Sequence, residues 1–358
     1  MLSQKRNTIL ALLLPIQIGI VQYLSHFQNL IEIYYSNQVY PILSKLLRLL
    51  FGWIPFSVGD VLLLLLIFVS LRFLILSFRY QLKHQLHRVI RALAVVSLIH
   101  FCFYLFWGLN YFRKPLDSQF GFKTSEYTTE ALISTTTAIV KKANTYHQKL
   151  TENDTIIVKF PMSKSEMYTI AVDGYDSLSK EYPNFKYSIK SVKHSGLSLF
   201  QSYNGTSGYL NPLTGEAQVN AKILKTGYPT TVCHEMAHQI GFAAENEANF
   251  IGFLAANYNT NPYFKYSSYR MALAYCLHEL RKRDPEKHKE ILSTIHKGIL
   301  KDYHNSYQFW QQYKNPLEPI FKKGYNAYLK ANNQQKGIDS YNYVVDLLIS
   351  YYQFRAEI

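Results

Sequence analysis

Residues 234–252 read HEMAHQIGFAAENEANFIG, and this stretch contains the candidate metal ligands that the surrounding fold must position. His234 and His238 stand four residues apart, so on an α-helix both imidazoles lie on one face and can reach a single tetrahedral cation. Glu235 lies just off that face, where its carboxylate can accept a proton from a water molecule beside the cation. The alternative is an ordinary amphipathic helix with two surface histidines. The residues around the motif must decide between a metal site and such a helix.

The sequence predicts a sharp end to this helix and a second helix soon after it. Gly241 stands three residues after His238, and a left-handed glycine commonly ends a helix and turns the chain. A helix is then predicted over residues 244–258. Its positions 245, 248, 249 and 252 share one face, and the small residues among them allow close approach to the first helix.

Glu245 begins this stripe and is the preferred third ligand. Two imidazoles and one carboxylate are a ligand set of catalytic Zn²⁺ sites, which keep one coordination position open, so Zn²⁺ is the expected cofactor. Glu247 lies on the other side of the same helix and remains the alternative ligand. Asn249, one turn beyond Glu245, is expected either to orient a ligand by a hydrogen bond or to serve only in helix packing.

A β-hairpin is predicted upstream, because two short extended runs flank an Asn-Pro and Thr-Gly turn between residues 209 and 221. The second run contains Ala217, Gln218, Val219 and Asn220. We expect it to be an edge strand beside the first helix, where an extended peptide can add by main-chain hydrogen bonds. A plain connecting hairpin is the alternative. Pro229 and the two threonines after it are helix-start signals, with either threonine able to cap the helix.

The first 114 residues have the composition of a membrane anchor. Three largely apolar segments predict transmembrane helices at about residues 9–26, 58–78 and 92–111. Gln17 is one of the residues that interrupt the first segment, whereas the second is apolar almost throughout. Because no small-x-small cleavage site follows the first segment, we expect an uncleaved anchor rather than a signal peptide.

Positive charge orients the anchor, since loops rich in lysine and arginine stay in the cytoplasm. The residues concerned are Lys5, Arg6, Arg79, Lys83, Arg88 and Arg91. Residues 115–358 then form one domain on the outer face of a bacterial cytoplasmic membrane. Residues 28–54 are amphipathic and can lie along the outer interface, although Lys45 and Arg48 argue against this orientation. Without the first span, the site would be cytoplasmic instead.

The part after residue 121 reads mainly as helix, so the expected fold class is α+β and helix-rich, with one core for about 240 residues. The predicted helices cover residues 128–150, 163–180, 244–258, 267–281, 285–303 and 341–351, and strands are predicted at 155–160, at 188–192 and in the hairpin. The last helix is too short to cross a bilayer and is expected to pack on the domain.

Cysteine usage and charge argue against a disulfide-stabilised fold and against a nucleic-acid-binding protein. The 358-residue chain has three cysteines and a net charge of +14. Cys102, Cys233 and Cys276 fall in unlike segments, so we expect no disulfide, and we expect Cys233 to be a small buried side chain. The charge comes without a basic cluster or a binding motif, so we expect no nucleic-acid partner; it can hold the domain near anionic lipid.

The spacing of residues 234–245 resembles the HExxHxxGxxH motif of the metzincin peptidases, with Glu245 in place of histidine and one position later. Residues 245–249, ExxAN, resemble the third-ligand helix of membrane-integrated and of repressor-cleaving zinc peptidases. In those families the first glutamate binds zinc, which implies the same role for Glu245.

The whole chain resembles a family of bacterial membrane proteins that is catalogued as a domain of unknown function and belongs with the zincin-like peptidases. The likeness rests on residues 55–60 (PFSVGD), 107–111 (WGLNY), 215–220 (GEAQVN) and 234–252. It implies a zincin-like metallopeptidase domain after the membrane anchor and supplies no substrate.

The expected protein is therefore a membrane-anchored zinc metallopeptidase, with a peptide or protein substrate and the lipid bilayer as partners. Glu235 would be the general base, and Tyr266, Tyr269 or His278 could stabilise the oxyanion. A zinc hydrolase acting on lipid or cell-wall amides is one alternative, and a non-catalytic interaction protein that keeps the fold is another. An edge strand beside the helix favours peptide; a deep apolar funnel facing the bilayer favours lipid.

Overall fold

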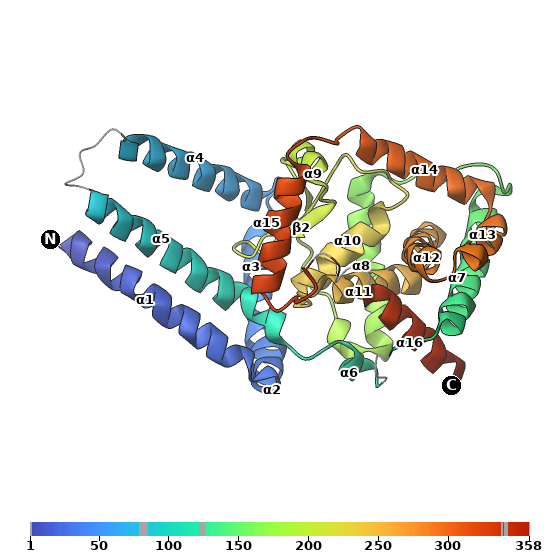
Figure 1. Ribbon diagram of the computed structural model, residues 1–358, viewed down its shortest axis with the longest axis horizontal. Coiled ribbons are helices and arrows are strands. Elements are labelled where there is room, and N and C mark those ends of the chain that lie inside the picture. Colours follow the sequence, from blue (N-terminus) through green and yellow to red (C-terminus); the bar gives the residue numbers. More distant parts are fainter. Residues whose placement is uncertain (1, 79–84, 122–125, 338, 340–342, 358) are drawn as a thin grey trace.

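The molecule is elongated, with three apolar helices at one end and a folded helical domain at the other (Figure 1). The computed structural model describes residues 2–78, 85–121, 126–337, 339 and 343–357. Arg79 and Lys83 of the charged connection, and the predicted start of the last helix at residue 341, lie outside the described residues.

The described elements follow one another along the chain with short connections. They are α1 (Leu2–Ser25), α2 (Gln28–Leu30), the π-helix η1 (Ile31–Val39), α3 (Tyr40–Phe51), α4 (Val58–Phe78), α5 (Gln85–Phe106), the 3-10 helix η3 (Gly108–Phe112), α6 (Asp117–Phe120), α7 (Thr129–Thr151), α8 (Lys164–Glu181), the 3-10 helix η4 (Pro183–Phe185), β1 (Val192–His194), α9 (Ser198–Asn204), β2 (Gly208–Leu210), β3 (Ala217–Val219), α10 (Tyr228–Gln239), α11 (Glu245–Tyr258), α12 (Pro262–Arg283), α13 (Pro285–Ser293), α14 (Lys297–Gln311), α15 (Glu318–Ala331) and α16 (Val344–Glu357).

Among the described residues, three helices are long and apolar enough to cross a membrane, as the sequence predicts. The candidate spans are Gln4–Ser25, Val58–Ser77 and Gln85–Phe106, within α1, α4 and α5. The third is shorter at its end than predicted, because α5 stops at Phe106 and a 3-10 turn begins at Gly108. A Cβ at Gly108 would lie 2.6 Å from the Phe103 ring, so a larger residue here would have to displace this ring.

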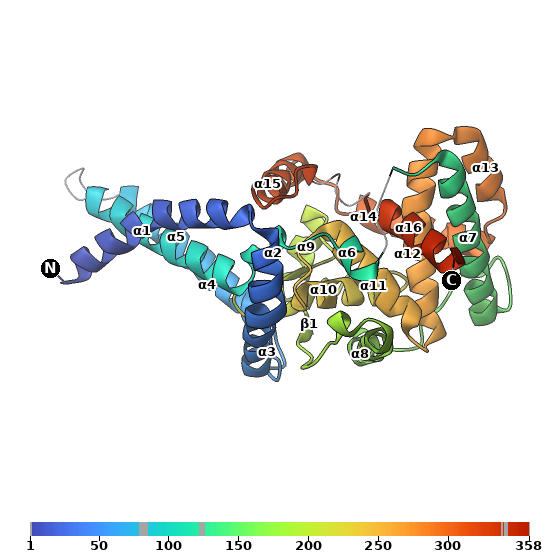
Figure 2. The ribbon, with the colours of Figure 1, turned by 90° about the horizontal axis from the view of Figure 1, so that it is seen from below.

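The first and third spans, α1 and α5, pack side by side (Figures 1 and 2). Gln17 of α1 donates to the Ser97 hydroxyl at 3.2 Å, and its carbonyl oxygen lies 3.2 Å from Nδ1 of His100. Polar groups in apolar helices stabilise helix association when they find each other. This pairing explains why the first apolar run carries a glutamine.

The sheet is small, and its strand order corrects one prediction. Three strands lie in the order β1-β3-β2, with β1 parallel and β2 antiparallel to β3. Residues Ala217–Val219, predicted as an edge, form the central strand and are fully buried, because β1 pairs with their other side. Asn220 follows within the fold and donates to Ser202. The edge strand beside α10 is β2.

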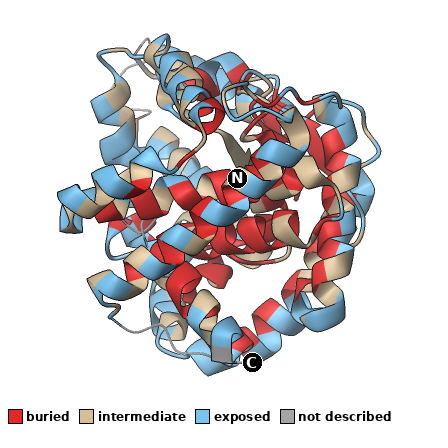
Figure 3. Cartoon of the chain, turned by 90° about the vertical axis from the view of Figure 1, so that its right-hand side faces the viewer, coloured by how far each residue is buried: buried red, intermediate tan, exposed pale blue. Residues whose placement is uncertain are grey.

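The core of the domain is helical, and its buried residues gather on the central helices (Figure 3). α10 and α11 approach closely at Gly252, where a Cβ would lie 3.0 Å from the main-chain nitrogen of His234. The predicted stripe of small residues on α11 therefore has the packing role expected of it. α16 packs on α11, where the rings of Tyr351 and Phe250 meet edge to face with centroids 5.7 Å apart, which confirms the expectation for the C-terminal helix.

Two predicted strands and one predicted helix differ from the structure for local reasons. Residues 155–160 form no strand, and the carbonyls of Thr155 and Phe160 instead accept hydrogen bonds from lysine side chains. The strand predicted at 188–192 is shifted to β1, because Ile189 has a φ of 63°. The helix predicted at 285–303 is broken between α13 and α14, where Asn144 bonds the carbonyl of Thr294 and the N–H of His296.

A second, smaller apolar cluster joins the membrane part to the domain. It consists of Ile31, Tyr35, Tyr40, Trp107, Tyr111, Phe112 and Ala243. Beside it, Arg113 forms a buried ion pair with Glu32 at 2.7 Å and donates to the carbonyl of Gly241 at 2.8 Å. The turn that ends the HExxH helix is therefore packed against residues of the membrane part.

Candidate metal centre

The helix that carries the HExxH motif, α10, begins and ends where the sequence indicates. Pro229 occupies its first turn, but the hydroxyls of Thr230 and Thr231 donate to the carbonyl of Gly227, so the predicted threonine cap is wrong. At the other end, Gly241 has a φ of 97° and its N–H donates to the carbonyl of His238. The N–H of Phe242 donates to Ala237 in turn, and the two bonds together form a Schellman motif.

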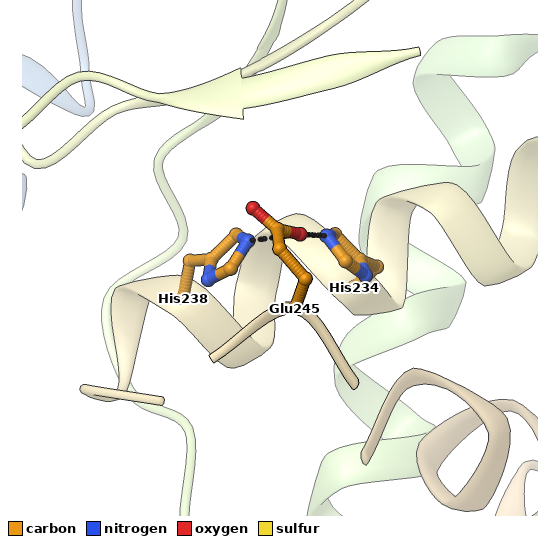
Figure 4. Close-up of side chains that lie close together, drawn as sticks. All are labelled: His234, His238 and Glu245. Atoms are coloured by element: carbon orange, nitrogen blue, oxygen red, sulfur yellow. Dashed lines mark ion pairs between the residues drawn. The ribbon is translucent and has the colours of Figure 1, made fainter. Parts of the chain in front are cut away.

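His234, His238 and Glu245 meet at one point between α10 and α11 (Figure 4). Oε2 of Glu245 lies 3.2 Å from Nε2 of His234 and 3.6 Å from Nε2 of His238. One potential ligand atom from each residue lies within 4.8 Å of the other two. Oε2 is buried and accepts no hydrogen bond from the described residues, although both rings lie close to it. Its lone pairs therefore remain available to a further ligand.

The His238 ring is fixed by its main-chain neighbour. Its Nδ1 lies 2.7 Å from the carbonyl oxygen of Phe242, which is an acceptor only, so Nδ1 carries a proton and Nε2 faces Glu245. The two imidazole rings are nearly perpendicular, with centroids 4.6 Å apart. Nδ1 of His234 has no partner among the described residues.

The charges in this cluster favour an ionised carboxylate. Burial alone raises the pKa of Glu245, but the facing rings of His238 and His234 outweigh it and hold that pKa well below its usual value. Burial lowers the pKa of His238, but Glu245 reverses this and raises it to about 9. The site thus pairs a negative carboxylate with a His238 ring whose protonated form this carboxylate stabilises.

Glu235 lies beside the cluster and faces the same cleft. Its side chain is 3% exposed, and its Oε2 has no hydrogen bond among the described residues. Burial raises the pKa of this carboxyl, against the lowering effect of the two histidines. The strand β2 passes close by: a Cβ at Gly208 would lie 2.5 Å from Oε1 of Glu235. Glycine therefore allows the strand to approach this carboxylate.

The other residues predicted for the site, Glu247 and Asn249, make hydrogen bonds outside the cluster. Glu247 accepts a hydrogen bond from the N–H of Leu116 at 2.8 Å and is not part of the cluster. Asn249 donates to the hydroxyl of Tyr275 at 3.2 Å, so no bond that it makes within the described chain reaches His234, His238 or Glu245. Asn249 lines the same cleft as Glu245, one helical turn away, and its orienting role stays a prediction.

The cluster lies in a cleft of about 730 Å³. One wall consists of α10, α11 and the edge strand β2. The lining also contains Trp107 and Tyr111 from the end of the third candidate span, and Phe321, Tyr325 and Tyr328 from α15. The cleft is therefore built jointly by the HExxH helix and by residues that belong to, or pack on, the membrane part.

Comparison with known proteins identifies a family. Residues 35–349 match the family described as "Protein of unknown function (DUF3810)". The chain belongs to the DUF3810 family. Searches of curated proteins and of solved structures found no match. The matched residues include α3, two of the three candidate spans of the described chain, and His234, His238 and Glu245.

Sequence reasoning missed one DUF3810 residue in direct contact with the cluster. Tyr325 of α15 donates from its hydroxyl to Oε1 of Glu245 at 2.6 Å. Residues 318–331 repeat large apolar side chains at helical spacing, which could have revealed the helix but not its contact. Within the described cleft, Tyr266, Tyr269 and His278 are not lining residues: the first bonds Asp302, the second stacks on Tyr146, and the third is exposed.

The expectations for cysteine are confirmed in the described chain. Cys233 is fully buried on α10, and its hydrogen-bond neighbour Tyr175 bonds its carbonyl rather than its thiol. Cys102, Cys233 and Cys276 are all free. None of the three belongs to the His234, His238 and Glu245 cluster among the described residues.

Proposed function

We propose that the protein is a zinc-dependent, zincin-like peptidase anchored in the membrane. One observation carries the proposal: the ligand atoms of His234, His238 and Glu245 converge next to the unpartnered carboxylate oxygen of Glu235, inside one cleft. This is the group of residues that metal-assisted hydrolysis requires.

The donor set and its spacing fit zinc. With bonds of about 2.0–2.1 Å in a tetrahedral arrangement, neighbouring ligand atoms are separated by about 3.3–3.4 Å. The two separations to Oε2 of Glu245 are 3.2 and 3.6 Å. Oε2 of Glu245 has no hydrogen-bond partner among the described residues, and the Phe242 carbonyl holds His238 with its proton on Nδ1. Both Oε2 and Nε2 of His238 therefore have a lone pair free for a metal ion.

Zinc bound there would supply a Lewis acid that polarises the scissile carbonyl and acidifies a water molecule. Glu235 would accept the proton of the attacking water at its free oxygen and deliver it to the leaving amine. Its burial makes it a stronger base than an exposed carboxylate, because burial raises its pKa. Phe242 keeps the His238 ring in the tautomer whose Nε2 is free.

The edge of β2 supports a peptide as the substrate. The N–H of Asn220 bonds Ser207, and the N–H of Asn211 bonds Glu216, so Ser207 and Asn211 face the central strand. In an antiparallel pair every second residue bonds to the neighbouring strand, so the N–H and C=O groups of Gly208 and Leu210 point away from β3, toward the open edge. An extended peptide can pair with this edge and bring its scissile bond over Glu235.

A hydrolase of lipid or cell-wall amides is the second candidate, and the aromatic wall of the cleft favours it. Trp107, Phe321 and Tyr328 could contact an acyl chain. An acyl chain, however, makes no use of the donors and acceptors on β2, so peptide is the better substrate. A non-catalytic role would give no reason for a buried carboxylate without a partner at Glu235.

The orientation proposed for the domain is extracytoplasmic. Figure 1 shows the start of α1, the end of α4 and the start of α5 at the same end of the molecule, away from the domain. Lys5 and Arg6 at this end, with Arg88 and Arg91 in the first turns of α5, favour the cytoplasm. The domain then lies on the outer side of the membrane.

The proposal is tested on the full-length protein in detergent. We expect about one zinc per chain by elemental mass spectrometry in both the wild type and Glu235→Gln. A fluorescence-quenched peptide mixture with randomised cores should be cleaved by the wild type and about 10²–10⁴-fold more slowly by the variant. Equal cleavage by both proteins would remove Glu235 as the base, and a metal-free wild type that cleaves nothing would refute the peptidase.

A further inference from the structure

The end of the third candidate span is in contact with the cluster of His234, His238 and Glu245. Trp107 directly follows Phe106, the last residue of α5, and its ring lies 5.7 Å from the His238 ring in a perpendicular arrangement. Trp107 is 4% exposed and lines the cleft together with Tyr111. One wall of the cleft is therefore built by residues at the boundary of a membrane span.

The helix α3 is amphipathic in the opposite sense to a helix on a soluble domain. Ser44 and Arg48 face the protein, whereas Lys45 is exposed: Ser44 donates to the carbonyl of Gln239 at 2.7 Å, and Arg48 donates to that of Ile189 at 3.3 Å. Its apolar residues face outward, with Ile42 62% and Leu49 60% exposed. Such a face needs an apolar covering.

The covering of α3 is the bilayer. Only residues 52–57 separate α3 from α4, a helix long and apolar enough to be a span. In Figures 1 and 2, α3 runs across the direction of the apolar helices at the level where they meet the domain. A helix in this position, with its apolar face outward, lies in the membrane interface. The membrane surface then runs along α3.

The distance from this surface to the cluster is short. The hydroxyl of Tyr40, at the start of α3, donates to the carbonyl of His238 at 3.2 Å, so α3 and α10 are direct neighbours. Ser44, also on α3, donates to the carbonyl of Gln239 at 2.7 Å. The surface along α3 is therefore separated by α3 alone from the helix that carries His234 and His238.

The wall formed by α15 is also fastened at membrane level. The hydroxyl of Tyr328 lies 3.1 Å from that of Tyr111, and Tyr104 of α5 donates to Asn332 at 3.1 Å. The exposed residues Leu317 and Ile320 mark the start of this segment. The cleft is thus bordered by membrane-level elements on two sides, where a chain leaving the bilayer can enter it.

We propose, on the basis of the peptidase function above, that the substrate is a membrane-anchored polypeptide that is cut close to its own anchor. The scissile bond would lie within the first few residues outside the bilayer. The free edge of β2 pairs with this segment, and Trp107 and Tyr111 contact the residues nearest the membrane.

The test uses the full-length protein with zinc in liposomes. Quenched peptides with one randomised eight-residue core are attached to a polyleucine anchor through Gly-Ser spacers of 2 or 25 residues, and the same core is made without an anchor. Both anchored probes have the same density in the membrane, so their comparison isolates distance. We expect the short-spacer probe to be cleaved about tenfold faster than the long-spacer probe, because effective concentration falls with spacer length.

Three outcomes overturn the inference. Cleavage of the long-spacer probe as fast as the short one, or of the free core as fast as either, would show that the site does not select membrane-proximal chains, while the peptidase would stand. Absence of cleavage of every probe by zinc-loaded protein would refute the peptidase and the inference together.

A second measurement locates the membrane surface without any reaction. A fluorophore on Leu46→Cys of α3, in a Cys102→Ser background, should be quenched by brominated lipid. The same label on Glu286→Cys of α13, at the far end of the domain, is the matched control and should not be quenched (Figure 1). Lack of quenching at position 46 would place α3 away from the bilayer and overturn the inference alone.

Discussion

At the scale of single residues, two glutamates of α11 have opposite surroundings although they are two positions apart. Oε2 of Glu245 faces Nε2 of both histidines, whereas Oε1 of Glu247 accepts the N–H of Leu116. Successive helical residues are rotated by about 100°, so these side chains point about 200° apart. Only one of them can belong to the cluster, and the choice between them follows from which face of α11 packs on α10.

This difference predicts opposite effects on metal binding. Glu245→Gln should weaken zinc binding by more than about 100-fold, because it removes the only anionic donor of the set. Loss of a residue that only supports a ligand costs up to about 100-fold, and loss of a ligand should cost more. Glu247→Gln should change it little. Competition with a zinc-binding dye measures both constants, and a weak-binding Glu247→Gln beside an unaffected Glu245→Gln would reverse the assignment.

At the scale of elements, the site depends on how closely β2 and α10 approach each other. Gly208 is the contact point, because a Cβ there would lie 2.5 Å from Oε1 and 2.8 Å from Cδ of Glu235. The chain at Gly208 lies outside the left-handed region, so alanine fits its backbone. The requirement for glycine at this position is one of space rather than of conformation.

Gly208→Ala should therefore displace the Glu235 carboxylate and leave the metal in place. A shift of about 1 Å in a catalytic group can cost about 100-fold in rate. We expect a fall in peptide cleavage of that order with unchanged zinc content. Gly324→Ala on α15, where a Cβ would meet nothing within 4 Å, is the control. Equal activity of the two variants would mean that β2 does not constrain the base.

At the scale of the whole molecule, one carboxyl links the domain to the segment that leaves the membrane part. Glu247 bonds the N–H of Leu116, and Arg113, which pairs with Glu32, lies in the same segment. Burial raises the pKa of Glu247 from 4.5 to about 7, against the lowering effect of Arg113. The folded chain therefore prefers this carboxyl protonated.

The stability of the molecule should depend on pH through this group. Because the pKa is higher in the folded than in the unfolded chain, its contribution is present below about pH 4.5 and is lost as the pH rises through about 7. A shift of this size corresponds to about 3 kcal/mol. Melting temperatures of the wild type and Glu247→Gln, with chelator present, should diverge between pH 5 and 8 in favour of the variant. A constant difference would contradict this origin.

Local patterns predicted the elements well where one residue type decides them. Gly241 ends α10 because only a left-handed residue turns the chain there, and the apolar runs give three helices long enough for spans. Predictions failed where distant residues decide. Asn144 breaks the helix predicted at 285–303, and β1 converts the supposed edge Ala217–Val219 into a central strand.

The sequence by itself determined the chemistry of the candidate site: two imidazoles on one helical face, a carboxylate beside them, and a choice of two glutamates for the next helix. Helical periodicity is local, so it needs no knowledge of the rest of the chain. Only the tertiary structure decided between Glu245 and Glu247, brought Tyr325 to Glu245, and set Trp107 against His238. These contacts join residues that are far apart in the chain, and such contacts depend on how whole helices pack.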